Sequence, residues 1–486
     1  MTIPIPTNEQ LLIPTLVTAL DLVVSLTASA HVVLTKRDTR AAIGWIGLIW
    51  LSPILGSALY GLLGINRIRR KARRLRRGKS GTGREPARPC PSAVLHEALT
   101  PEGEHLDDLA EVVGRLTELP LLEGNRVEPL TRGDKAYEAM IGAIDGAERS
   151  VALSSYIFND DPAGRQFVAA LARAVARQVE VRVLVDDVGR RYDWPTILGP
   201  LRRAGVPVAT FLPTLVPGWF PYMNLRNHRK ILVADGRAGF TGGMNIDADY
   251  LDHPRPRRPK ADLHFRVEGP VVAHLQRTFA DDWAFRTGER LRGAAWFPHL
   301  GPAGPILARG IADGPDEQMG KLRIVLQGAI ACARSSIAIV TPYFLPDAAL
   351  ISALNVAAMR GVRVDIVLPR RTNHVLVQWA STALLWQVLE RGCRVWASPP
   401  PFDHTKLMVV DRVWSLVGSA NWDPRSLRLN FEFDVECYGP SLAADLDALV
   451  RAKIRAAAPI TLEQVDGRRL PIRLRDGVAR LLSPYL

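Results

Sequence analysis

One pattern of charged residues occurs twice in this chain. Residues 226–247 read RNHRKILVADGRAGFTGGMNID, and residues 401–423 read PFDHTKLMVVDRVWSLVGSANWD. Each copy has His-x-Lys, four apolar residues, an Asp, and then a Gly-containing turn that ends in Asn. A fold for this chain must therefore present two equivalent sets of charged groups. The glycines permit a close approach of the backbone to a ligand beside each set.

The segments around the two motifs alternate between strand and helix patterns. Residues 150–158 and 179–189 are typical of strands, and residues 164–178 between them have the spacing of an amphipathic helix. The same order returns over residues 336–371. Helices between apolar strands favour an α/β fold with a parallel or mixed sheet. The long period of the repeat predicts two homologous domains.

The N-terminal part of the chain contains two long apolar stretches. Residues 11–34 are interrupted by Asp21 and His31, and residues 41–64 carry no charge. Each is long enough to cross a hydrocarbon core of about 30 Å, with a buried core helix as the alternative. Residues 66–79, NRIRRKARRLRRGK, are far more basic than the connection between the two stretches. The positive-inside rule places this run in the cytoplasm, where we expect it against anionic headgroups, with a solvated linker or a nucleic-acid-binding arm as the alternative.

These patterns divide the chain into four segments. We predict a transmembrane hairpin over 11–64, a basic juxtamembrane segment and linker over 65–128, and two domains over 129–305 and 306–486. The net charge of +13 favours anionic partners such as phospholipid headgroups, nucleic acids or phosphate esters. The four cysteines are scattered, so we expect reduced thiols and no metal site.

The two motifs together suit the chemistry of a phosphodiester. Alternation along a strand puts His228 and Lys230 on one face, and likewise His404 and Lys406. Lysines, asparagines and backbone N–H groups bind phosphate, and an imidazole on either side of phosphorus permits double displacement without a metal. One imidazole attacks phosphorus, and the other donates a proton to the leaving alkoxide and then deprotonates the acceptor.

The duplicated HxKxxxxD motif resembles that of the phospholipase D superfamily. Within it, the chain is similar to bacterial cardiolipin synthases of the phospholipase D type from about residue 10 onward. The likeness includes YIFNDDPAGRQF, RVEGPVV, TPYFLPD and GSANWDPRSLRLNFEF. It implies two phospholipase D-like domains that form one active site at their interface, after an N-terminal two-helix transmembrane hairpin.

The resemblance also implies a role for each site residue. His228 is implied as the nucleophile and His404 as the general acid and base, with the reverse assignment as the alternative because the halves are alike. The groups implied to bind phosphate or line its pocket are Lys230, Lys406, Asn245, Asn421, Gly243 and Ser419. The motif residues Asp235 and Asp411 are implied to organise the motif. Asp262 and Glu432 are implied to hold the imidazoles, although each alone could form a surface salt bridge.

The reaction implied is a transfer between two phosphatidylglycerol molecules, which gives cardiolipin and glycerol through a phosphohistidine. No cofactor, metal or nucleic acid is expected, and an oligomer is not required. The catalytic domains would lie on the cytoplasmic side of a bacterial inner membrane, and residues 211–224 and 372–386 are candidates for the pocket rim. Three alternatives remain: a phospholipase D hydrolase that uses water, a phospholipase D-family nuclease, and a non-catalytic membrane scaffold, against which the two intact motifs argue.

Overall fold

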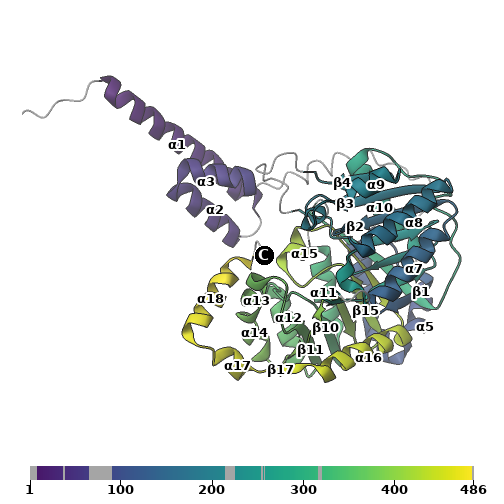
Figure 1. Cartoon of the computed structure of the whole chain (residues 1–486). Coiled ribbons are helices and arrows are strands. Elements are labelled where there is room, and N and C mark those ends of the chain that lie inside the picture. The colour runs from purple at the N-terminus through teal and green to yellow at the C-terminus, as the bar shows by residue number, and fades with distance from the viewer. Residues whose placement is uncertain are drawn as a thin grey trace, which may run out of the picture. The chain divides into compact units, whose positions relative to one another are not determined.

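The computed structural model describes residues 8–36, 39–64, 90–213, 225–252, 256, 258–315 and 320–483. The described helices up to Gly64 form one compact unit, and the described residues from Cys90 onward belong to a second (Figure 1). The basic run 66–79 and the candidate rim residues 214–224 lie outside the described residues.

The N-terminal unit contains one helix that is long and apolar enough to cross a membrane. This segment, Thr15–Thr35, belongs to α1 (Asn8–Thr35), which packs against α2 (Thr39–Leu51) and α3 (Pro53–Leu59). Buried side chains between these helices are those of Val32, Ile49 and Tyr60. Nδ1 of His31 lies 2.7 Å from the hydroxyl of Tyr60, so this ionisable group has a protein partner within the predicted span.

The second predicted span, residues 41–64, is not one continuous helix. It is divided into α2, α3 and a π-helical turn, Tyr60–Gly64. Ser52 leaves the helical region at φ −149° and ψ 81°, immediately before Pro53. The ring of a proline clashes with a helical conformation of the preceding residue, which explains the break. The absence of charge therefore predicted the apolar character of this stretch but not its interruption.

A single mixed sheet of fifteen strands forms the centre of the larger unit, in the order β17-β12-β11-β10-β14-β15-β16-β9-β1-β8-β6-β5-β2-β3-β4. The strands are β1 (Leu122–Leu130), β2 (Ser150–Ser155), β3 (Glu180–Asp186), β4 (Val208–Phe211), β5 (Ile231–Ala234), β6 (Ala238–Gly242), β8 (His264–Glu268), β9 (Ile306–Asp313), β10 (Ser336–Val340), β11 (Arg363–Pro369), β12 (Arg394–Ser398), β14 (Leu407–Val410), β15 (Trp414–Gly418), β16 (Glu432–Tyr438) and β17 (Ala458–Ile460). Two short strands, β7 (Lys260–Ala261) and β13 (Phe402–Asp403), pair separately. The predicted α/β fold is confirmed.

The strand order repeats on either side of the antiparallel pair β1 and β9. Outward from β1 come β8, β6, β5, β2, β3 and β4, and outward from β9 come β16, β15, β14, β10, β11 and β12. The strands β2, β3 and β4 are parallel to one another, as are β10, β11 and β12, and the other pairs are antiparallel, including β12 with the edge strand β17. The motif strands β5 and β14 are buried along their whole length, which suits the apolar runs ILVA and LMVV.

Helices pack along this sheet and complete two apolar cores. They are α5 (Ser92–Gly103), α6 (Asp107–Leu116), α7 (Gly133–Asp145), α8 (Pro162–Ala176), α9 (Leu198–Arg203), α10 (Val272–Thr287), α11 (Lys321–Cys332), α12 (Ala348–Met359), α13 (Val375–Thr382), α14 (Trp386–Leu389), α15 (Pro424–Arg428), α16 (Pro440–Ala456), α17 (Leu462–Asp466) and α18 (Leu470–Leu481). Local sequence signals mark where a helix begins. At α8, the Asp161 side chain caps the helix by accepting a hydrogen bond from Gly164 N–H, and Pro162 stands in the first turn.

Helices α5 and α6 differ from the expectation of a linker over 65–128. Leu106, Leu109 and Val113 are buried in the same core as β10 and β14. Their spacing places them on one face of a helical turn, which is the periodicity that indicates a packed helix. The folded unit therefore begins well before residue 129.

Candidate active site

The two His-x-Lys pairs have the same local structure. His228 and Lys230 immediately precede β5, and His404 and Lys406 immediately precede β14. All four side chains are buried. Lys230 Nζ donates a hydrogen bond of 2.7 Å to the carbonyl oxygen of His228, and Lys406 donates in the same way to His404. The predicted placement of His and Lys side by side is thus observed in both copies.

Each imidazole contacts a carboxylate from the other half of the sheet. Nδ1 of His228 lies 3.0 Å from Glu432 Oε2, and Nδ1 of His404 lies 2.8 Å from Asp262 Oδ2. Backbone pairing holds these crossings in place, because Asn227 pairs with Phe431 and β7 pairs with β13. A carboxylate on Nδ1 fixes the tautomer and leaves Nε2 for chemistry. Both acids are buried, so neither forms a surface salt bridge.

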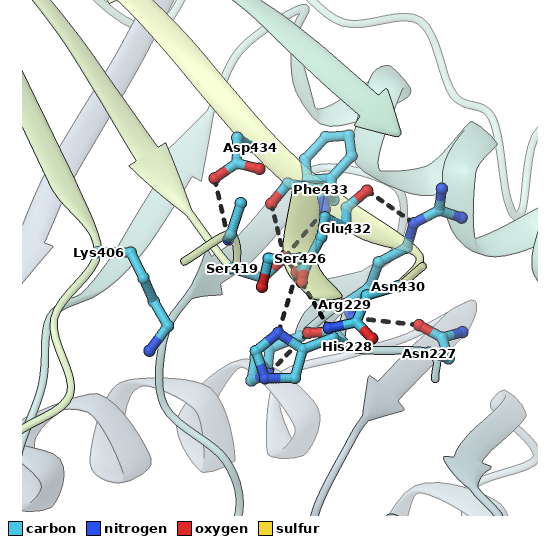
Figure 2. A network of polar contacts seen from close by, with 12 residues as sticks. Asn227, His228, Arg229, Lys406, Ser419, Ser426, Asn430, Glu432, Phe433 and Asp434 are labelled. Carbon is cyan, nitrogen blue, oxygen red and sulfur yellow. Dashed lines mark hydrogen bonds and ion pairs between the residues drawn. The ribbon is translucent and has the colours of Figure 1, made fainter. Parts of the chain in front are cut away.

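The carboxylate of Glu432 is held by two further donors (Figure 2). Ser419 Oγ donates to Oε2 at 2.5 Å, and Asn430 Nδ2 donates to Oε1 at 3.0 Å. Burial acts to raise the pKa of Glu432, but the neighbouring His228 and Lys230 and the Ser419 hydroxyl outweigh it and lower the pKa. Glu432 is therefore an ionised, fully coordinated partner of His228.

The carboxyl of Asp262 has a different environment. Burial raises its pKa to about 7, although the charge of Lys406 opposes this rise. Leu263 N–H donates to Oδ1 at 2.8 Å, and the Tyr250 hydroxyl lies 3.4 Å from Nδ1 of His404. A Cβ on Gly243 would stand 2.3 Å from Asp262 Oδ1, so this position needs glycine for the close approach of the carboxyl.

Burial also controls the charge of the histidines and lysines. It lowers the pKa of Lys230 to about 7 and that of Lys406 to about 8. It lowers the pKa of His228 to about 4, despite the opposing charge of Glu432. The pKa of His404 falls well below its ordinary value through burial and the charges of Lys406 and Lys230. An anionic phosphate would stabilise the protonated forms of all four groups.

The two asparagines stand in the turns that follow the motif strands. Asn245 Oδ1 accepts a hydrogen bond of 3.2 Å from Ile157 N–H, which orients its amide. Asn421 and Lys406 line a small cavity together with Asp434 and a group of mainly apolar side chains. The buried Asn421 Oδ1 has no hydrogen-bond partner among the described residues, so this amide is available to a ligand in the cavity.

The motif aspartates lie at the far end of each motif strand. Asp235 accepts backbone N–H groups of residues 148–150, and Asp411 those of residues 334–336. Asp411 also contacts Nε2 of the buried His105 at 2.7 Å. Four residues of strand lie between each Lys and its Asp, so the two are five steps and about 16 Å apart at the usual rise. The two carboxylates thus organise turns and do not reach the imidazoles.

Two buried ionisable residues beside the lysines were missed by the sequence analysis. In the strand register, Gly242 lies opposite His264, and Gly418 lies opposite Asp434. On their other side the same two glycines face the motif strands. Extending that pairing by one residue puts Lys230 opposite Gly242 and Lys406 opposite Gly418. A Cβ on Gly242 would stand 2.9 Å from His264 Nδ1, and a Cβ on Gly418 would stand 2.4 Å from Asp434 Oδ1. Both distances are shorter than van der Waals contact. The imidazole and the carboxyl therefore lie over glycine, towards the lysines.

Alternation could have identified these two residues, because each follows a predicted acid by two positions on the same strand face. Burial lowers the pKa of His264 to about 3 and raises that of Asp434 well above its ordinary value. Burial therefore favours the neutral form of each group.

Aromatic side chains complete the walls of the site. The ring of Tyr156 packs edge-on against His228 at 5.1 Å between centroids, and Lys230 Nζ lies 5.5 Å from the same ring. Tyr343 takes the corresponding place at 6.3 Å from the His404 ring. Within the described ranges, no cluster of three or more His, Cys, Asp or Glu side chains has the arrangement of a metal site.

Comparison with known proteins identifies the family. The family model described as cardiolipin synthase, PLD-like domain, matches residues 140–283 and 326–453, together more than half of the chain. Cardiolipin synthase A of Pseudomonas fluorescens Pf-5 is 32% identical over 463 residues, which cover 95% of this chain and 96% of the relative. The major cardiolipin synthase ClsA of Bacillus subtilis is 31% identical and covers 93% of this chain and 95% of the relative.

A solved structure has the same fold. The phosphatidylserine synthase of Haemophilus influenzae Rd KW20 matches with a TM-score of 0.61 at 16% identity, over 78% of this chain and all of that protein. On the family model and the near-complete coverage of its relatives, this chain belongs to the cardiolipin synthase family with phospholipase D-like domains.

Proposed function

We propose that this protein is a membrane-associated cardiolipin synthase, a phosphatidyltransferase that joins two phosphatidylglycerol molecules and releases glycerol. The observation that carries the proposal is the pair of crossed imidazole–carboxylate contacts beside two buried lysines. It stands in a chain that resembles cardiolipin synthases along nearly its whole length. Two lysines and two asparagines suit the charge and size of one phosphodiester.

The proposal includes the architecture expected from the sequence. Two homologous domains, near 129–305 and 306–486, would supply one His-x-Lys set each and share one site. The repeated strand order and the two regions matched by the family model support this division. The packing of α1 against α2 and α3 supports a membrane-embedded hairpin over 11–64. The basic run 66–79 favours a catalytic unit on the cytoplasmic side of a bacterial inner membrane.

In the first half-reaction, Nε2 of His228 attacks phosphorus of the donor lipid. A P–N bond forms, the P–O bond to glycerol breaks, and His404 gives its proton to the departing alkoxide. His228 suits this role because Glu432 stabilises the positive charge that develops on the ring. His404 must enter the step protonated, which the bound phosphate favours against the effect of burial. Lys230 and Lys406 stabilise the charge on the non-bridging oxygens.

In the second half-reaction, a terminal hydroxyl of the acceptor lipid's glycerol attacks the phosphohistidine. His404 accepts the hydroxyl proton, the new P–O bond forms, and the P–N bond breaks. Asp262 holds the His404 ring through Nδ1 in both steps. A pKa of about 7 lets this carboxyl share the charge change of its imidazole near neutral pH. Asp235 and Asp411 act on this chemistry only through the turns that they hold.

The test uses the full chain, purified and reconstituted with phosphatidylglycerol in the presence of EDTA, with lipid products identified by mass spectrometry. We expect cardiolipin and glycerol in equal amounts from the wild type, none from His228→Ala, and at most about 1% of the wild-type amounts from His404→Ala. His96→Ala is the matched control, because this side chain is 60% exposed and contacts Asp107 on α6. Phosphatidic acid without cardiolipin would show that water is the acceptor, and cleavage of nucleic acid with no lipid product would refute the lipid reaction.

A further inference from the structure

Helix α18 directs a stripe of large apolar side chains into solvent. Leu470, Leu474, Val478 and Leu481, here called the α18 stripe, follow each other at helical spacing and are 77%, 67%, 54% and 72% exposed. The residues of α18 that are buried against the protein are Asp476 and Ala479. A surface helix of a globular domain normally has the reverse arrangement, with its apolar side inward.

Specific contacts hold α18 in this orientation. Arg475 donates two hydrogen bonds to Asp476, at 2.9 and 2.7 Å, and Arg468 pairs with the same carboxylate. The Arg475 guanidinium lies 4.2 Å from the ring centre of Trp379 on α13. Ala479 joins a small core with residues of α13, against which α18 packs (Figure 1). The stripe therefore faces outward because the opposite side of the helix is built to dock.

Arginines flank the α18 stripe on both sides. At 100° per residue, Arg473 and Arg480 stand on one side of Leu474, and Arg475 stands on the other. The acidic residue of α18, Asp476, is buried and paired. An apolar stripe bordered by cations is the pattern of a helix that lies in the interface of an anionic bilayer.

We propose that α18 rests on a bilayer that contains anionic phospholipid, with the stripe at the boundary between headgroups and acyl chains and with Arg473 and Arg480 against phosphates. This goes beyond the proposed function, because it adds to the N-terminal hairpin a membrane contact made by the unit that carries the site. The helix beneath, α13, exposes Val375 and Leu376 as well.

A short series of contacts connects this surface to the site. Asn373 and His374, just before α13, contact Tyr343 through a hydrogen bond of 2.6 Å and ring packing at 5.6 Å. Tyr343 also packs against His404. A bilayer seated on α18 would therefore lie close to the wall of the pocket in which lipid headgroups react.

Depth-dependent quenching tests the location directly. In the full chain with Cys90 and Cys332 replaced by Ser, a nitrobenzoxadiazole label is attached to Val478→Cys, or to Val356→Cys on α12 as the matched control. Val356 is also 54% exposed, but it lies on another helix. The labelled proteins are reconstituted in vesicles of phosphatidylcholine with or without phosphatidylglycerol, doped with lipid that carries a doxyl group near the headgroup.

We expect quenching at position 478 to exceed that at 356 by about threefold in the anionic vesicles and to weaken in the neutral ones. Equal quenching at the two positions would overturn the proposal. A label at 478 that is already shielded in detergent, with no response to doxyl lipid, would also overturn it, because the stripe would then be covered by a second copy or by another part of the chain.

Activity provides the second test. Leu474→Asp with Val478→Asp should lower the rate of cardiolipin synthesis in vesicles about tenfold and leave the rate in mixed micelles within about twofold of the wild type. The control is Val356→Asp with Met359→Asp, which should match the wild type in both. Equal losses in vesicles and micelles would show a structural role and refute the membrane contact. If the wild type made no cardiolipin, the proposed function would fail while the quenching result stood.

Discussion

The two imidazoles have carboxylate partners in different environments. Beside His228, the ionised carboxylate of Glu432 accepts hydrogen bonds from Ser419 and Asn430. Beside His404, the carboxyl of Asp262, with a pKa of about 7, packs against Gly243. The backbone of the two regions is alike: each imidazole precedes a buried strand, and each lysine donates to the carbonyl of its own histidine. The comparison teaches that similar strands position the groups, while unlike neighbours set their protonation.

This difference matches the two roles that the reaction needs. A nucleophile must start neutral, keep its orientation and have its developing positive charge stabilised, which suits the ionised, hydrogen-bonded partner of His228. A general acid and base must exchange a proton, which suits a partner whose own pKa lies near 7. The asymmetry of the carboxylates therefore favours His228 over His404 as the nucleophile.

The largest expected effect separates the two histidines. His228→Ala should lower the rate by about 10⁴-fold or more with any substrate, since no phosphoenzyme can form. His404→Ala should lose about 10²–10⁴-fold on phosphatidylglycerol. With a nitrophenol leaving group, which departs without a proton, His404→Ala should still release a burst of nitrophenol and accumulate a labelled phosphoenzyme. Rapid-quench measurement of the burst checks this, and a burst from His228→Ala instead would reverse the assignment.

The second prediction concerns the two lysines. Removing either by substitution with Met should lower kcat/KM by about 10²–10³-fold. In the wild type, kcat/KM should fall as the pH rises through about 7 to 8, because the free enzyme then loses the charges that attract phosphate.

The lysines should also differ from each other in this pH profile. The charge of Lys406 lowers the pKa of Lys230, so Lys406→Met should move the alkaline limb of the residual activity to higher pH. The pH dependence of kcat/KM and of kcat, measured side by side, gives the result. An alkaline limb that stays unchanged in both variants would contradict the assignment of these pKa values.

The third prediction contrasts the two carboxylates. Glu432→Gln should cost about 100-fold in kcat at every pH between 5 and 8, because the native group is ionised throughout. Asp262→Asn resembles the protonated acid, which dominates below pH 7, so its cost should be small at pH 6 and reach about tenfold at pH 8. The ratio of wild-type to variant kcat across pH measures this. Parallel profiles for the two variants would show that the carboxylates are equivalent.

The sequence predicted some of these features for identifiable reasons. Alternation along an apolar strand was enough to put His and Lys side by side, and a repeated α/β pattern was enough for the fold class. The crossing of Asp262 to His404 and of Glu432 to His228 could not be predicted, because it depends on contacts between strands far apart in the chain. The break before Pro53 and the burial of Leu109 and Val113 do have local signals, namely the proline itself and the four-residue spacing of the two apolar side chains.

The smallest expected effects concern the pair beside the lysines, His264 and Asp434. Because burial raises the pKa of Asp434, the folded protein binds this proton more tightly than the unfolded chain, and stability falls as the pH rises above the ordinary value of 3.8. Because burial lowers the pKa of His264 from 6.5 to about 3, stability is lost as the pH falls through that interval. The two residues thus destabilise the fold in opposite directions of pH.

Asn is close in shape to a neutral carboxyl, so Asp434→Asn should change the free energy of unfolding by no more than about 1 kcal/mol near pH 5 and should stabilise the protein relative to wild type at pH 8. His264→Asn should instead flatten the acid side of the stability profile, at the cost of a cavity. Thermal unfolding of the full chain in detergent, followed from pH 4 to 9, measures both slopes. Asp447→Asn is the control, since this aspartate of α16 is paired with Arg451 away from the site. If Asp434→Asn were less stable than wild type at pH 8 and also lost activity, Asp434 would have to be an ionised partner of Lys406. Lys406 would then have a carboxylate beside it where Lys230 has the neutral His264, and the two halves would differ in the charge of their lysines as well.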